Sequence, residues 1–201
     1  MKALPIVCVA FLLSSTGAAV AQAQSSEPAA RPEHVENGTP ITQLIATVQK
    51  KTGKRFVVDP QVHGDVELVE KDLASISYSD FLTILQVYGY SAFETGGYIE
   101  VLPIANARTI GVPIISGDEK RPDAQIVTKI LGAKNIPVAQ LVPILRPMIP
   151  RYGHFAALPC VNKLIVVDTF ANVRRIEAVI QSMDVGEPYK PGPCGGLPAE
   201  H

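Results

Sequence analysis

The sequence predicts an α+β protein built from two small domains. In residues 38–104, two amphipathic helix patterns are interleaved with short strand patterns, and in residues 125–184 the order is strand, helix, strand, strand, helix. Between them, residues 105–124 lose apolar periodicity and contain Pro and Gly turn signals, so we interpret them as a linker. A chain of 201 residues is long enough for two such cores.

The chain begins with a pattern typical of a secretory signal peptide. Lys2 precedes an apolar run over residues 3–13, and small residues follow up to Ala23. The run is shorter than the roughly 20 residues needed to cross a bilayer, and more than one small-x-small triplet is available for cleavage. We therefore expect residues 1–23 to be removed on export and residues 24–37 to form an exposed leader.

In the first domain, four sequence signals define the elements. Thr39-Pro40 is a typical helix entry, and the apolar residues after it follow helical spacing until Gly53. Ser77 and Asp80 form a capping-box pattern before a second helix. The segment 90–102, with Gly96-Gly97 in its middle, predicts a β-hairpin. Phe56 to Val58 reads as a short buried strand.

The second domain has an equally clear order of patterns. A strand is expected at 125–131, a helix from about Pro137, two strands at 154–158 and 163–167, and a capped helix from Asp168-Thr169 to Met183. Pro143 interrupts the first of these helices, so a kink or an early end is expected there. Residues 185–201 have the Pro and Gly content of a flexible tail.

Composition excludes several classes of function. The chain has 18 basic and 19 acidic side chains and no basic stripe, which argues against nucleic-acid binding. No Gly-rich phosphate loop or nucleophile elbow is present, so we predict neither a cofactor nor a small-molecule substrate nor an enzyme. A hydrolase using His154 or Cys160 is the least favoured reading.

No metal site is predicted, because the histidines are dispersed along the chain and lack ligand spacing: His34, His63, His154 and His201. The acidic residues that could suggest paired catalytic carboxylates alternate with apolar ones, as on a solvated strand face: Asp59, Asp65, Glu67 and Glu70. Arg174-Arg175 is interpreted as a solvated helix face.

Two cysteines, Cys160 and Cys194, remain after the signal peptide. An exported protein meets an oxidising compartment, where a disulfide between them would attach the tail to the second domain. The Pro- and Gly-rich sequence around Cys194 favours the unpaired alternative, so the sequence leaves the pairing open.

Particular residue strings resemble one family. Residues 52–66, TGKRFVVDPQVHGDV, resemble a signature in the first periplasmic domain of type II secretion secretins, and residues 81–90 are similar to the helix that follows it. Residues 140–150, QLVPILRPMIP, resemble a helix of the next secretin domain, and the family pattern shares Pro143. Residues 162–177 are similar to its last strand and helix.

The resemblance implies a secretin first-domain-like α/β sandwich followed by a KH-like βαββα domain, both in the periplasm and associated with an outer-membrane secretion complex. In that family these domains bind an inner-membrane clamp protein, partly by adding a strand to a sheet edge. Here that strand corresponds to Glu33 through Asn37, so His34, Val35, Glu36 and Asn37 are the expected protein-binding residues. Val35 is the only apolar residue among them, which departs from the family pattern.

The resemblance also implies partners. The inner-membrane clamp protein, a full-length secretin or secreted proteins are the expected ones, and a homo-oligomer is expected by analogy. A secretin continues into further periplasmic domains and a channel barrel, so a chain stopping at His201 is not expected to form a pore alone. The alternative function is a periplasmic adaptor of another envelope machine, for pilus assembly, phage extrusion or transport signalling.

Overall fold

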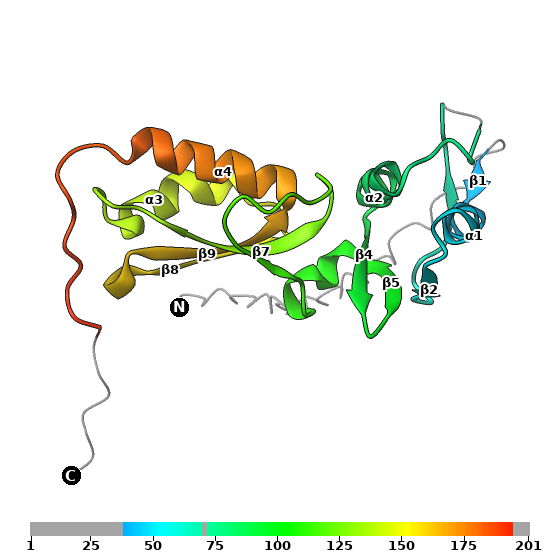
Figure 1. The fold of residues 1–201 in the computed structure, drawn as a ribbon, viewed down its shortest axis with the longest axis horizontal. Coiled ribbons are helices and arrows are strands. Elements are labelled where there is room, and N and C mark those ends of the chain that lie inside the picture. The colour runs from blue at the N-terminus through cyan, green and yellow to red at the C-terminus, as the bar shows by residue number, and fades with distance from the viewer. Residues whose placement is uncertain (1–37, 70–71, 195–201) are drawn as a thin grey trace, which may run out of the picture. The chain divides into compact units, whose positions relative to one another are not determined.

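Figure 1 shows the computed structural model of the chain, which describes residues 38–69 and 72–194. The expected signal peptide and leader lie outside the described residues. Helices and open sheets are both present, which confirms the α+β class. Among the described residues, no helix is both long and apolar enough to cross a bilayer.

The first domain contains two helices and two small sheets. Its helices are α1 (Ile41–Thr52) and α2 (Tyr78–Val87). A two-stranded antiparallel sheet pairs β1 (Thr39–Pro40) with β3 (Asp65–Val66). A three-stranded sheet has the order β2-β5-β4, with β2 (Arg55–Val58) parallel to β5 (Tyr98–Pro103) and β4 (Tyr90–Thr95) antiparallel to it.

The expected entry at Thr39-Pro40 is wrong, because both residues lie in β1 and Pro40 precedes the first helical residue, Ile41, without a side-chain cap. The other expected helix signals are confirmed. The apolar stripe of α1 is buried, and the helix ends at Gly53, whose φ of 67° is the left-handed conformation that glycine adopts without strain. Ser77 caps α2, because its hydroxyl accepts from the Asp80 N–H and the Asp80 carboxylate accepts from the Ser77 N–H. These hydrogen bonds lower the pKa of Asp80.

One apolar core holds the first domain together. Both helices contribute fully buried side chains to it, and the three-stranded sheet contributes Ile99 and Val101. The members from the helices are Ile41, Leu44, Ile45, Val48, Phe81, Leu82 and Leu85. Burial of apolar surface is the main contribution to the stability of a domain of this size.

Strand β2 differs from the expectation of a buried strand. Val57 is 50% exposed and Arg55 is exposed, whereas Phe56 and Val58 pack against the core. The reason is that the apolar core packs against only one face of this strand, so alternate side chains remain in water. Three consecutive apolar residues therefore do not mean burial on both faces here.

The second domain is a four-stranded sheet covered by two helices. The strand order is β6-β7-β9-β8, formed by β6 (Ile114–Ile115), β7 (Ile126–Gly132), β9 (Lys163–Thr169) and β8 (His154–Leu158). Helices α3 (Val138–Leu145) and α4 (Phe170–Met183) lie on the same face of this sheet (Figure 1). Along the chain, β7 to α4 follow the expected order of strand, helix, strand, strand, helix.

Helix α3 continues through Pro143 and is followed by a short 3-10 helix at Arg146–Met148. Proline removes the hydrogen bond to the carbonyl four residues earlier, which belongs to Ala139. Ala139 is exposed, so water can satisfy that carbonyl. The expected early stop therefore falls at residues 146–148 and not at Pro143.

Residues 105–124, expected to be a linker, contain regular structure. A 3-10 helix spans Ile104–Thr109, where Ala107 is fully buried. Strand β6 pairs in parallel with β7, and the Thr128 N–H donates to the Pro113 carbonyl at 2.8 Å. Two residues are too few to show strand periodicity in a sequence, which is why the pattern gave no sign of β6.

Candidate protein-binding surfaces

The expected protein-binding residues, His34 to Asn37, lie outside the described residues and directly before β1. In the antiparallel pair, Thr39 of β1 faces Val66 and Pro40 faces Asp65. The Ile41 N–H extends the pairing by donating to the Gly64 carbonyl at 3.0 Å. The segment that is expected to bind a partner thus comes directly before this small sheet in the sequence.

Two tyrosine hydroxyls occupy the outer edge of β3. The Tyr88 hydroxyl accepts from the Glu67 N–H at 2.6 Å and contacts the Glu67 carbonyl at 3.4 Å. The Tyr90 hydroxyl donates to the His63 carbonyl at 3.0 Å and accepts from the His63 N–H at 3.4 Å. Because Gly64 faces β1, alternation turns His63 and Glu67 to the opposite side. The tyrosines therefore take the place of a neighbouring strand.

Strand β1 offers the other edge of this sheet. Within its described residues, Pro40 has no N–H to donate to an added strand. Donors for strand addition on this side must therefore come from Gly38, which faces the same side as Pro40, and from the residues before it. The geometry favours the β1 side over the β3 side for a partner strand, since the β3 edge already has its hydrogen bonds.

Lys51 fixes the loop that leads into α2. Its ammonium donates to the carbonyls of Ala74 at 2.8 Å, Ser75 at 3.2 Å and Ile76 at 3.0 Å. A cation on the last turn of α1 is also favoured by the helix dipole. The sequence gave no signal for this role, because the three carbonyls belong to backbone more than 20 residues away.

The polar residues weighed as catalytic or metal-binding candidates are not brought together. Asp59 accepts from the Gln61 N–H at 2.7 Å and thereby forms a local turn. His63 and His154 are both exposed, and His154 lies on β8. Residues 38–69 and 72–194 contain no group of three or more His, Cys, Asp or Glu that could hold a metal ion. Glu70, His34 and His201 lie outside the described residues.

In the second domain, Asn162 ties the turn between β8 and β9 to the loop before α3. It is buried and adopts a φ of 50°, which asparagine tolerates better than most residues. Its side-chain oxygen accepts from the Val138 N–H at 2.8 Å, and its amide donates to the carbonyls of Ala133 at 2.7 Å and Ile136 at 3.0 Å. Asn162 thus supplies a hydrogen-bond acceptor for a backbone N–H at the start of α3, as an N-cap side chain would otherwise do.

Asp184 holds the same loop from the end of α4. Its carboxylate accepts from the backbone N–H groups of Lys134 at 2.7 Å, Asn135 at 2.6 Å and Ile136 at 3.3 Å. The hydrogen bond from the Lys134 N–H is the largest cause of a lowered pKa for Asp184, and those from Asn135 and Ile136 add to it. The loop is therefore fixed from both sides by side chains.

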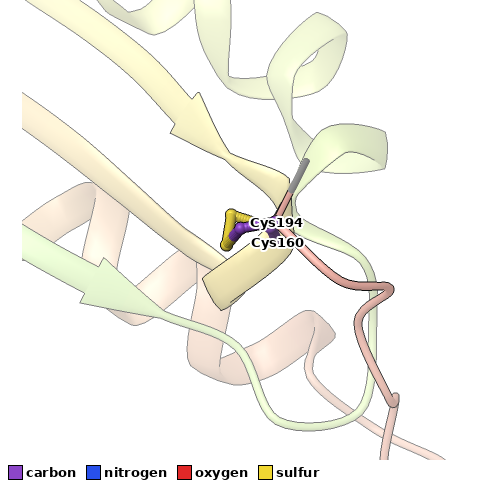
Figure 2. The surroundings of a disulfide bond; sticks show 2 residues. All are labelled: Cys160 and Cys194. Carbon is purple, nitrogen blue, oxygen red and sulfur yellow. A yellow bond between two sulfur atoms is a disulfide. The ribbon is translucent and has the colours of Figure 1, made fainter. Parts of the chain in front are cut away.

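The two cysteines left open by the sequence are joined by a disulfide in the structure (Figure 2). Cys160 lies in the turn at Pro159–Val161, and Cys194 lies in the tail, with their Cα atoms 4.8 Å apart. The tail is also attached at Tyr189, whose N–H donates to the Lys134 carbonyl at 2.8 Å. Residues 185–194 are thus fastened to the second domain at two points.

A charged cavity of about 380 Å³ lies beside β7 and α4. At its wall, Lys129 is buried and its ammonium lies 2.6 Å from the Glu177 carboxylate and 3.2 Å from the Gly117 carbonyl. Arg174 pairs with Asp123 at 2.9 Å and stacks over a phenylalanine ring. Lys129 and Arg174 are therefore engaged with carboxylates of the same chain.

Asp168, at the end of β9, is a buried carboxyl of the second domain. Burial is the main cause that raises its pKa, against hydrogen bonds from Asn172 and Thr169 that lower it. Those hydrogen bonds occupy both carboxylate oxygens, so Asp168 serves the start of α4.

Comparison with known proteins gives a consistent picture. Residues 37–101 match a family model described as "GspD-like, N0 domain". Secretin XcpQ of Pseudomonas aeruginosa is 37% identical over 146 residues, which cover 72% of this chain and 21% of that protein. Secretin GspD of Vibrio cholerae is 30% identical over 152 residues, which cover 73% of this chain and 23% of that protein. The chain thus spans about a fifth of the length of these relatives.

A solved structure shares the fold as well. The type II secretion system outer-membrane complex of Klebsiella pneumoniae, which contains PulD, PulS and the PulC HR domain, matches with a TM-score of 0.64 and 26% identity. The match covers 73% of this chain and 26% of the matched chain.

Proposed function

Because residues 37–101 are a GspD-like N0 domain and the chain is related over most of its length to the N-terminal part of type II secretins, we propose that it is a periplasmic protein-protein interaction component of a type II secretion apparatus. The proposed partner is the inner-membrane clamp protein, and the proposed role is non-catalytic. The relationship to two curated secretins over about 150 residues carries this proposal.

The partner is proposed from the Klebsiella structure, in which a secretin is found together with the PulC HR domain. The proposed contact is strand addition along β1, which extends the strand through His34 to Asn37. Two observations support the β1 side. The segment leads directly into β1, and the tyrosine hydroxyls already bond the backbone of the β3 edge.

The non-catalytic role is supported by the state of the candidate groups. Cys160 is bonded to Cys194 and is not a thiol nucleophile. His154 is exposed on a sheet edge, and Lys129 and Arg174 at the wall of the charged cavity are paired with carboxylates of the same chain. A hydrolytic site would need a titratable group beside a second polar group and a substrate pocket.

Calorimetric titration with the periplasmic domain of the clamp protein from the same organism tests the proposal. We expect saturable binding with a Kd in the range of about 1–100 µM, typical of transient interfaces. Glu36→Pro should weaken it by about tenfold or more, because alternation along the extended strand turns residue 36, like Pro40, towards the partner, and proline removes its backbone donor. No binding at high protein concentration would overturn the clamp partner.

Tyr88→Phe and Tyr90→Phe are the matched controls for the edge. Each removes one hydroxyl from the β3 side and leaves β1 unchanged. If the partner adds at β1, both variants bind as the wild type does. Tighter binding by these variants would instead place the partner strand on β3.

A further inference from the structure

The charged cavity beside β7 and α4 has a second wall, which is formed by residues 117–123. The charged side chains on that wall are Asp118, Glu119, Lys120, Arg121 and Asp123. Glu119 contacts Arg121, and Asp123 is paired with Arg174. Within residues 38–69 and 72–194, the Lys120 ammonium and the Asp118 carboxylate have no hydrogen bond or ion pair. This wall therefore keeps charged groups that the fold itself does not use.

The guanidinium of Arg121 is only partly used. Its Nη2 group donates to the Glu119 carboxylate, and the two side chains are 35% and 38% exposed. Its Nε is buried, and among the described residues it is the one buried side-chain nitrogen or oxygen without a hydrogen-bond partner. A buried donor without an acceptor is costly, so in natural structures such a group is usually met by water, an ion or a ligand.

The missing partner of Arg121 is an acceptor, because a guanidinium has five donors and no acceptor. Nε and Nη2 together form a planar fork that binds a carboxylate through two parallel hydrogen bonds, and Glu119 occupies only the Nη2 half of it. Lys120 adds an unpaired ammonium to the same wall. A carboxylate at this fork thus meets two positive groups, in a cavity whose 380 Å³ suit a small ligand.

Arg121 also lines a second cavity of about 270 Å³, together with Glu94 of β4. Among the described residues that line this smaller cavity, Arg121 is the only cation, and the Glu94 carboxylate would repel an anion there. The larger cavity is the better place for an anion, because Lys120 lies on its wall as well.

We propose that the larger cavity is a carboxylate-binding site, in which the Nε and Nη2 groups of Arg121 bind the ligand and Lys120 pairs with the same charge. The ligand displaces Glu119 from Nη2, which costs little because an exposed ion pair contributes little free energy. The carboxylate comes from a small carboxylic acid or from an acidic side chain of a protein. This inference does not depend on the proposed clamp contact, which concerns β1 of the first domain.

Heteronuclear NMR on the exported chain with its disulfide formed tests the site through the Arg121 Nε–H signal. Butyrate is the probe, and butyramide is its neutral counterpart. Butyrate should shift this signal and the backbone signals of residues 117–123 saturably, with a Kd in the range of about 1–50 mM, whereas butyramide should not.

A short peptide distinguishes the two sources of the carboxylate. Acetyl-Ala-Glu-Ala-amide presents the same group on a backbone, and acetyl-Ala-Gln-Ala-amide is its neutral control. A lower Kd for the acidic peptide than for butyrate identifies an acidic side chain of a protein as the ligand. A Kd that is equal or higher identifies a small carboxylic acid.

Four variants assign the binding to named groups through the backbone signals. Arg121→Gln should weaken butyrate binding by about tenfold or more, and Lys120→Gln by about threefold. Glu119→Gln removes the carboxylate that competes for Nη2, so it should tighten binding by about threefold, which loss of structure would not do. Arg175→Gln is the matched control, because this exposed residue of α4 does not line the cavity, and it should leave the Kd unchanged.

Three results would overturn the proposal. An Arg121 Nε–H signal that does not move at about 100 mM butyrate would mean that water meets the buried donor. A Kd unchanged by Lys120→Gln would remove the ligand from the larger cavity. Equal weakening by Arg175→Gln and Arg121→Gln would reduce the effect to general attraction by positive charge. Loss of the clamp interaction, by contrast, would leave these results unchanged.

Discussion

The two domains of this chain hold their loops and other irregular segments in place by different side-chain contacts. The first uses separate hydrogen bonds from long side chains: Tyr88 and Tyr90 on the β3 edge, and Lys51 on the loop before α2. The second concentrates its fastenings at one end of the sheet, where Asn162 and Asp184 hold one loop and the disulfide holds the tail.

The difference relates stability to function. In the first domain, side-chain hydrogen bonds from Tyr88 and Tyr90 lie on the edge of β3, and one from Gln49 lies on β2. In the second domain, the side-chain hydrogen bonds of Asn162 and Asp184 and the disulfide gather at one end of the sheet. The comparison predicts that removing one of these side-chain contacts lowers the free energy of unfolding by a large amount in the second domain and by a small amount in the first.

Asn162→Ala should have the largest effect. It leaves three backbone groups without partners, two of them buried, and places alanine at positive φ, which together cost about 4 kcal/mol or more. Hydrogen–deuterium exchange should show faster exchange in β7 and β9 and no change in α1, whereas β4 and β5 share a buried cluster with β7 and β9 and are not the reference. Asn162→Asp keeps the acceptor for Val138 and should cost less. An equal loss of protection from exchange in both domains would contradict the view that each domain is held by its own side-chain contacts.

Removal of the disulfide should have the next largest effect. Its cysteines are separated by 34 residues, for which the chain-entropy model gives about 3–4 kcal/mol. Cys160→Ser combined with Cys194→Ser should lower the thermal midpoint of the second domain, and wild type in reductant should match it. A first domain that loses stability to the same extent would be inconsistent with the comparison.

Loss of the tyrosine hydroxyls should cost less. Tyr88→Phe and Tyr90→Phe each remove hydrogen bonds to partly solvated backbone, worth about 1 kcal/mol or less in urea unfolding. The double variant also exposes the β3 edge, so its tendency to aggregate should rise. If it remains as soluble as the wild type under the same conditions, the hydroxyls do not protect that edge.

The smallest effect concerns pH. Because the folded state lowers the pKa of Asp184, its stabilisation is present above the ordinary carboxyl pKa and is lost as pH falls through the lowered value. Asp184→Asn should therefore cost up to about 1 kcal/mol at pH 7 and less at pH 3. Asp80→Asn in the first domain should show the same sign. A variant effect that grows on acidification would refute this assignment.

Local signals made much of the fold predictable. The capping box at Ser77, the glycine after α1 and the hairpin around Gly96-Gly97 each act within a few residues, and the structure has all three. The helix stripes identified the core residues because periodicity of 3.6 is visible in a single chain.

The side-chain contacts that hold the loops and the tail were not predictable in the same way. Tyr88 reaches a backbone 21 residues away, and Asn162 and Asp184 reach a loop 24 to 50 residues away. Such contacts depend on the tertiary structure and leave no periodic trace. The cysteine pair was visible as a candidate, but its pairing required the path of the tail. The residues expected to bind a partner, His34 to Asn37, remain a prediction.

Strand β6 decides how the gene can be divided for separate expression of the two halves. A fragment beginning at Gln125 would keep every long element of the second domain, yet would lose Ile115, which is 2% exposed, and the acceptor for the Thr128 N–H. The start codon for that half belongs before Pro113. A library of truncations would then show a sharp drop in soluble yield between start points on either side of Ile114–Ile115.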